Sequence, residues 1–251
     1  MTNILILGGT TEASALARAL AERGMRTVLS YAGRTDNPRP QPVPVRVGGF
    51  GGAEGLARHL RDEGVTHLVD ATHPFAARMS AHAVTAARKA AVPLVALTRP
   101  GWTAGPGDDW RHVADIPAAV AALAGPARRV MLALGRMHVH AFAARPQHHY
   151  LLRFVDAPAA GEAPPLPRHH LVVDRGPFTA EGDERLMREQ EIDLVVAKNA
   201  GGTGAAAKLH AARALGLPVL MIDRPALPPR REMHDVEAVL RWIAHPADLG
   251  V

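Results

Sequence analysis

The sequence contains no cysteine, which excludes disulfide bonds and thiolate metal sites. No apolar run approaches the roughly 20 residues that span a membrane, and the first residues show neither a basic leader nor a small-residue cleavage site. We therefore expect a cytoplasmic protein that makes no membrane contact.

Aromatic residues make up only 4% of the 251-residue chain, so platforms on which nucleic-acid bases stack are scarce. The formal net charge is +5, and a basic balance favours an anionic partner. The basic residues are spread along the chain, and no helix-turn-helix or RNA-binding signature occurs. These features favour a phosphate or carboxylate ligand over nucleic acid. Lysine is rare, since the chain has only Lys89, Lys198 and Lys208.

Two long segments of the chain, 65–100 and 191–225, resemble each other. Each contains a short apolar strand, a polar loop, an Ala-rich helix, a second apolar strand and a final Arg-Pro pair. Upstream, VMLALGRMH at 130–138 matches NILILGGTT at 3–11 at nearly the same offset. Chance likeness between Ala-rich helices is the alternative, but the shared order of four elements favours an internal duplication.

The duplication predicts two units, 1–126 and 127–251, each of which alternates strands and helices. We expect strands near 3–7, 26–30, 43–47, 66–70, 93–97, 129–134, 149–155, 170–173, 193–197 and 218–222. We expect helices near 12–23, 53–63, 75–90, 116–124, 137–144, 179–190, 204–215 and 235–244. This alternation predicts an α/β fold with two Rossmann-like, doubly wound parallel-sheet domains. The segments that follow Arg99-Pro100 and Arg224-Pro225 either pack on their own sheet or cross to the other one.

A glycine pair follows the first strand, at the end where doubly wound folds bind ligands. The turn runs Gly8, Gly9, Thr10, Thr11, Glu12. Glycine lets a phosphate approach the backbone, the following helix directs its N–H groups at it, and the threonines add hydroxyl donors. We expect these five residues to bind a dinucleotide. The alternative is a tight turn in which Thr11 caps the helix.

The second strand ends in Ser30 and continues to Arg34 and Thr35, with no acid before Asp36. An NAD-binding unit usually has Asp or Glu here for the ribose hydroxyls, whereas serine, arginine and threonine suit a 2′-phosphate. We therefore expect NADPH as the cofactor, with Gly49 in the turn after the third strand close to it. The alternative for Arg34 is an ordinary solvated loop residue.

The motifs ILILGGTTEA, SYAGRT, DATHPFA and KNAGGTGAAAKLHAARALGLPVLMIDRP together resemble the precorrin-6A reductase family of cobalamin biosynthesis. The resemblance covers nearly the whole chain, and DATHPFA and the KNAGGTG turn are its specific parts. It implies NADPH-dependent reduction of one double bond in a tetrapyrrole macrocycle, giving precorrin-6B. It also implies a polycarboxylate substrate, and contact with neighbouring pathway enzymes is a further expectation.

DATHPFA begins at the end of the fourth strand, at the same edge as the glycine pair. We expect His73 to contact the substrate by a hydrogen bond or a carboxylate pair, with Arg78 one turn further along. His73, Lys198 and water are the candidate proton donors. The alternatives are a packing role for His73 and a helix-capping role for Thr72.

The second unit has its own glycine-rich turn, flanked by lysines in a chain that otherwise prefers arginine. Such a turn suits a substrate carboxylate. In the alignment of the two repeats, Arg136 stands opposite Gly9. This replacement favours dinucleotide binding by the first unit and carboxylate binding by the second. Lys208 facing solvent is the alternative for that residue, and Arg99 and Arg224 are open between capping strands and joining the units. The expected substrate-binding residues of this unit are Arg136, Lys198, Gly201, Gly202 and Lys208.

Two further features are ambiguous. Histidines cluster at 138–140, 148–149 and 169–170, but without a ligand spacing, so we expect no metal. The Pro-rich segment 156–170 is either a loop that closes over substrate or an inert connector. A non-catalytic NADPH-binding regulatory or assembly protein is the alternative function, and it would not need the basic glycine turn of the second unit.

Overall fold

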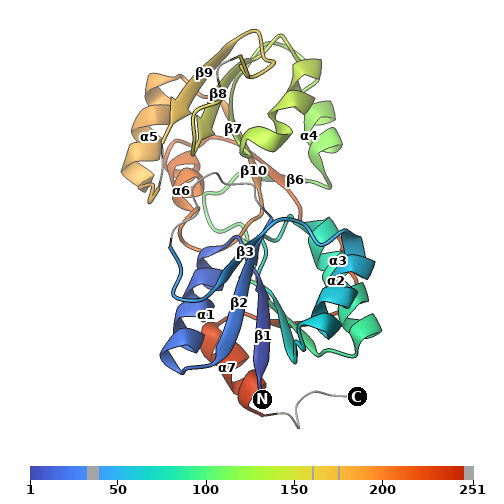
Figure 1. Ribbon diagram of the computed structural model, residues 1–251. Helices are drawn as coiled ribbons and strands as arrows, with labels where there is room; N and C mark the ends of the chain where they lie inside the picture. The colour runs from blue at the N-terminus through green and yellow to red at the C-terminus, as the bar shows by residue number, and fades with distance from the viewer. Residues whose placement is uncertain (33–39, 160, 175, 246–251) are drawn as a thin grey trace. The chain divides into compact units, whose positions relative to one another are not determined.

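The computed structural model describes residues 1–32, 40–159, 161–174 and 176–245, and the chain forms two compact units (Figure 1). The first unit contains Met1–Pro100 together with Ala226–Val251, and the second contains Gly101–Pro225. Among the described residues, no helix is both long and apolar enough to span a bilayer.

The first unit is built on a parallel six-stranded sheet with the order β12-β5-β4-β1-β2-β3. Its strands are β1 (Asn3–Leu7), β2 (Arg26–Tyr31), β3 (Val45–Val47), β4 (His67–Asp70), β5 (Leu94–Leu97) and β12 (Arg231–Met233). Its helices are α1 (Thr11–Glu22), α2 (Gly52–Asp62), α3 (Ala77–Ala90) and α7 (Val236–Ala244).

The second unit repeats this arrangement, with the strand order β6-β11-β10-β7-β8-β9. Its strands are β6 (Trp110–Val113), β7 (Arg129–Ala133), β8 (His149–Phe154), β9 (His169–Val173), β10 (Leu194–Lys198) and β11 (Val219–Ile222). Its helices are α4 (Ile116–Ala122), the 3₁₀ helix η1 (Arg136–Ala144), α5 (Ala180–Glu189) and α6 (Ala207–Ala214). The α/β fold class is thereby confirmed, and the matching strand orders are what an internal duplication predicts.

The division into units differs from the predicted consecutive halves, 1–126 and 127–251. Instead, β6 pairs in parallel with β11, and β12 pairs in parallel with β5. Each Arg-Pro pair therefore leads to a strand that completes the other unit's sheet, which settles the alternative that the sequence left open. The sequence did not predict β6 or β12, because WRHV and REM are short, largely exposed edge strands without an apolar run.

Some helix limits also differ from the prediction. The segment 137–144 is a 3₁₀ helix, and α3 and α6 begin a few residues later than expected, at Ala77 and Ala207. The end of α1 follows the prediction, since Gly24 adopts φ +65° and its N–H bonds the carbonyl of Ala21.

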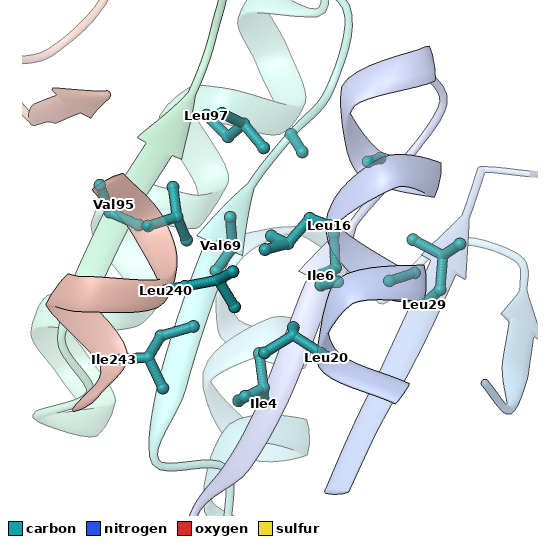
Figure 2. Packing of buried hydrophobic residues seen from close by; sticks show 14 of the residues in the cluster. Ile4, Ile6, Leu16, Leu20, Leu29, Val69, Val95, Leu97, Leu240 and Ile243 are labelled. Atoms are coloured by element: carbon teal, nitrogen blue, oxygen red, sulfur yellow. The ribbon is translucent and has the colours of Figure 1, made fainter. Parts of the chain in front are cut away.

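The core of the first unit shows how β12 and α7 are retained. Helices α1 and α7 cover one face of the sheet, and Figure 2 shows Leu16 and Leu20 of α1 beside Leu240 and Ile243 of α7. These side chains pack on buried strand residues such as Val69. The opposite face is covered by α2 and α3 through Leu56, Leu60 and Ala83, among others. Burial of α7 therefore ties the last described helix to the first strand.

We predict that Ile243→Ala destabilises the first unit, although the residue lies in the last helix. Ile243 is 4% exposed, and truncation of such a side chain to alanine costs about 2–5 kcal/mol. Hydrogen–deuterium exchange should accelerate in β1 and β5 and stay unchanged in β7 and β10. Arg241→Ala, an exposed change in the same helix, is the control. Acceleration confined to β10 and β11 would contradict this assignment.

Candidate functional site

The carboxyl ends of β1, β2 and β4 meet at one edge of the first sheet, as register pairs Leu7 with Ser30 and with Asp70. The loops that follow these strands contain the glycine pair and the DATHPFA motif. This edge is where doubly wound sheets bind ligands, and it brings the glycine pair and the DATHPFA motif to the same side of the sheet.

The glycine pair has two different structural roles. A Cβ on Gly8 would lie 2.6 Å from Cδ1 of Leu29, so a larger residue there would force this buried side chain to shift. Gly9 has φ +127°, is exposed, and an added Cβ there would meet nothing within 4 Å. Gly9 therefore leaves its backbone open to a ligand at the edge of the sheet.

Thr10, not Thr11, is the N-cap of α1. Its Oγ1 accepts from the N–H of Ala13 at 3.1 Å and donates to the carbonyl of Ala71 at 2.8 Å. Thr11 Oγ1 donates to Oε2 of Glu12 at 3.1 Å. The expected hydroxyl donors are thus engaged within the protein. Two backbone N–H groups of the first helical turn are also engaged, that of Ala13 by Thr10 and that of Glu12 by its own carboxylate. The start of α1 therefore attracts an anion chiefly through the positive end of the helix dipole.

Glu12 forms an ion pair with Arg99, which follows β5, with Nη1 3.2 Å from Oε1. Partial burial alone would raise the pKa of Glu12. Hydrogen bonding to its own backbone N–H and the charge of Arg99 outweigh that effect, so its pKa lies below the ordinary value. Arg99 therefore balances a carboxylate that would otherwise repel an anion at the helix start.

Strand β2 ends at Tyr31, one residue later than predicted, so Ser30 is its penultimate residue and is buried. The guanidinium of Arg46 lies beside it, with Nη1 3.4 Å from the serine Oγ. Arg46 also donates to the carbonyls of Gly48 at 2.5 Å and Gly49 at 2.7 Å. The sequence analysis did not single out Arg46. It could have been found from the predicted neighbouring strands β2 and β3, because their register pairs Ser30 with Arg46. The expected contacts Arg34 and Thr35 lie outside the described residues.

The DATHPFA turn is held from inside by Asp70, which is 2% exposed. Its Oδ1 accepts from the N–H of Thr72 at 3.1 Å and from the Thr72 hydroxyl at 2.7 Å, while its other oxygen pairs with Arg230. Thr72 is therefore not a helix cap, because α3 begins only at Ala77, with Ala76 as the N-cap residue.

His73 is half-buried in this turn, and its Nδ1 accepts from the backbone N–H of Phe75 at 3.2 Å. This bond requires Nδ1 to be unprotonated, so the neutral ring has its proton on Nε2. Arg78 is exposed on the first turn of α3. A histidine held by one ring nitrogen in this way is fixed in both orientation and tautomer.

In the second unit, the KNAGGTG turn follows β10 and is pinned by the segment that enters the unit. Trp102 donates its indole N–H to the carbonyl of Gly202 at 2.8 Å and its backbone N–H to Oδ1 of Asn199 at 2.7 Å. Asn199 returns a bond to the Trp102 carbonyl at 3.0 Å. Gly201 and Gly202 have φ +71° and +76°, which favours glycine at both positions.

The two lysines near this turn differ in position. Lys198 is half-buried at the end of β10. Lys208 is 8% exposed, donates to the carbonyl of Ala205 at 2.5 Å, and its Nζ lies 5.0 Å from the Trp102 ring centroid. Lys208 therefore does not face solvent, and its contacts hold the turn. Arg224 caps the same turn by donating to the carbonyls of Asn199 and Ala200.

Arg136 is exposed at the start of η1, after Gly135 at φ +71°. It lines a cavity of about 170 Å³ with Val139, His140, Phe154 and residues of the Pro-rich segment. Because the helix at this edge is 3₁₀, the second unit lacks the α-helix start that the first unit directs at its glycine pair. Within the described parts of the chain, no group of three histidine or acidic side chains forms a metal site.

Comparison with known proteins gives consistent results. A family model described as Precorrin-6x reductase CbiJ/CobK matches residues 3–244. The chain is 57% identical to the precorrin-6A reductase of Rhodobacter capsulatus over 97% of this chain and 96% of the relative. It is 29% identical to the cobalt-precorrin-6A reductase of Priestia megaterium over 89% and 91% of the two chains.

A solved structure described as CobK precorrin-6A reductase matches with a TM-score of 0.92 and 56% identity. The match covers 100% of this chain and 98% of that chain.

We predict that Arg99→Ala raises the pKa of Glu12. The depressed pKa means that Glu12 contributes to stability above its ordinary pKa and that this contribution disappears as the pH falls through the folded value. Without Arg99, the loss should begin at a higher pH. Carboxyl-carbon NMR titration of Glu12 measures the shift, with Arg23→Ala as the control. An unchanged Glu12 titration would show that the ion pair is not formed in solution.

Proposed function

Because the chain belongs to the precorrin-6x reductase family, we propose that it is a precorrin-6A reductase of cobalamin biosynthesis. Its product would be precorrin-6B, formed by reduction of one double bond of the macrocycle. The observation that carries this proposal is that the likeness to precorrin-6A reductases spans both units, including the edges of both sheets. A cofactor unit alone would not account for that extent.

We propose NADPH as the cofactor, bound at the edge of the first sheet. The open, positive-φ backbone at Gly9 and the start of α1 fit a pyrophosphate, and Arg99 offsets the charge of Glu12 there. Ser30 stands where an NAD-binding unit has an acid, so it accepts a 2′-phosphate without repulsion. The sequence adds Arg34 and Thr35 to the proposed contacts.

We propose that the second unit binds the carboxylate arms of the macrocycle. The exposed guanidinium of Arg136, the amine of Lys198 and the positive-φ backbone at Gly201 and Gly202 support this assignment. The contacts of Lys208 favour a positioning role for it, through Trp102 and the turn, rather than a direct ligand contact.

The reaction requires a hydride and a proton. When bound, NADPH would supply the hydride. The proton then comes from a side chain or from water, and His73 and Lys198 are the proposed donors. The bond from Phe75 to Nδ1 orients the His73 ring and holds it neutral, so proton donation by His73 requires that this bond open and that the ring become protonated at both nitrogens. Arg78, exposed nearby on α3, is proposed to bind a substrate carboxylate.

The alternative function is a non-catalytic NADPH-binding regulatory or assembly protein. Mixing the protein with NADPH and precorrin-6A and following nicotinamide absorbance separates the two. Turnover establishes the reductase, whereas binding of NADPH without turnover would favour the regulator.

We predict that His73→Gln lowers kcat by about 10²–10⁴-fold, the range for loss of a general acid. His82→Gln, the same change on α3, is the control and should leave kcat unchanged. If kcat of His73→Gln matches the wild type, the proton donor is another group, with Lys198 as the remaining side-chain candidate.

Arg34→Ala should weaken NADPH binding far more than NADH binding, because NADPH alone has the 2′-phosphate. Fluorescence titration of both cofactors measures the difference. An equal loss for the two cofactors would contradict a 2′-phosphate contact by Arg34.

A further inference from the structure

We propose that Arg46 is a specificity residue for the 2′-phosphate of the cofactor, a phosphate monoester that NADH lacks. The inference rests on the proposed binding of NADPH to the first unit and adds a residue that the sequence motifs do not contain.

The position of Arg46 follows from strand register. It pairs with Ser30 across β2 and β3, so both side chains lie on one face of the sheet near the carboxyl ends of these strands. In doubly wound folds, the residue that ends the second strand is the one that contacts the ribose bearing the 2′ group. Ser30 is the penultimate residue of β2 here, one before Tyr31, and the Arg46 guanidinium is its neighbour at 3.4 Å.

Arg46 differs from Arg99 and Arg230, two arginines of this unit that are neutralised by carboxylates. Arg99 pairs with Glu12, and Arg230 pairs with Asp70. Within the described residues, Arg46 contacts the Ser30 hydroxyl, two carbonyls and an aromatic ring, and no carboxylate. A half-buried cation that no described carboxylate neutralises, at the ligand edge of a sheet, is suited to an anionic ligand.

The guanidinium is also held in place before any ligand arrives. Its Cζ lies 3.9 Å from the ring centroid of Phe50, and its bonds to Gly48 and Gly49 fix its plane. Together with the bond to the Ser30 hydroxyl, these two bonds use three of the five N–H groups of the guanidinium, which leaves two for a phosphate oxygen. An arginine fixed in this way loses little side-chain entropy on binding. The free energy of its contact with the phosphate is therefore not reduced by the cost of ordering the side chain.

Arg46→Gln tests the proposal, because glutamine keeps an N–H donor and removes the charge. Calorimetric titration with 2′,5′-ADP and with 5′-ADP isolates the 2′-phosphate from the nicotinamide, and NADPH and NADH form the second pair. We expect binding of 2′,5′-ADP and NADPH to weaken by about 10- to 100-fold, the range for one charge-assisted contact, while 5′-ADP and NADH change little.

Arg26→Gln is the matched control, since Arg26 is an exposed arginine at the opposite end of β2. It should leave all four affinities unchanged. Arg46→Lys keeps the charge without the planar fork, so it should lose less affinity for 2′,5′-ADP than Arg46→Gln. If Arg46→Gln does not fold, the affinities of Arg46→Lys for the same four ligands test the proposal.

Equal weakening of NADPH and NADH would overturn the proposal, because Arg46 would then only hold the Gly48–Gly49 turn. Unchanged affinity for 2′,5′-ADP would overturn it as well. Failure of the wild-type protein to bind either dinucleotide would instead contradict the proposed cofactor itself.

Discussion

Backbone hydrogen bonding between strands that are distant in the sequence is the constraint on which this structure depends. β12 completes the first sheet against β5, and β6 completes the second against β11. The segments beside these strands also reach the functional turns. Arg230 precedes β12 and pairs with Asp70, and Trp102 precedes β6 and holds Asn199. Strand exchange therefore positions the turn at the carboxyl edge of each sheet as well as completing the sheet.

The two halves keep one topology and differ where a ligand would be selected. The first has an open glycine followed by an α-helix start, which suits phosphate. The second has Gly135 and Arg136 followed by a 3₁₀ helix, which offers a side-chain cation in place of aligned backbone N–H groups. A duplicated sheet can thus serve two ligands, because the loops change while the strand order stays fixed.

Much of the fold was predictable because buried parallel strands have apolar sequences, such as ILIL in β1 and LVVA in β10. β6 and β12 were not predictable, since their pairing comes from backbone bonds that leave no hydrophobic pattern. Within the site, the glycine turns followed from sequence. The engaged hydroxyl of Thr10, the burial of Lys208 and the position of Arg46 depend on partners brought together only by folding. Lys208 shows the general difficulty: rarity of a residue type marks a position without saying whether its charge meets a ligand or the protein's own carbonyls.

The exchange of edge strands also has a consequence for biosynthesis. Gly101–Pro225 is one uninterrupted stretch, whereas the unit that begins at Met1 requires residues beyond Ala226. During translation, all residues of the second unit therefore leave the ribosome before β12 and α7 of the first unit do. Until β12 emerges, the first unit is incomplete, and β5 exposes an unpaired strand edge to solvent and to chaperones.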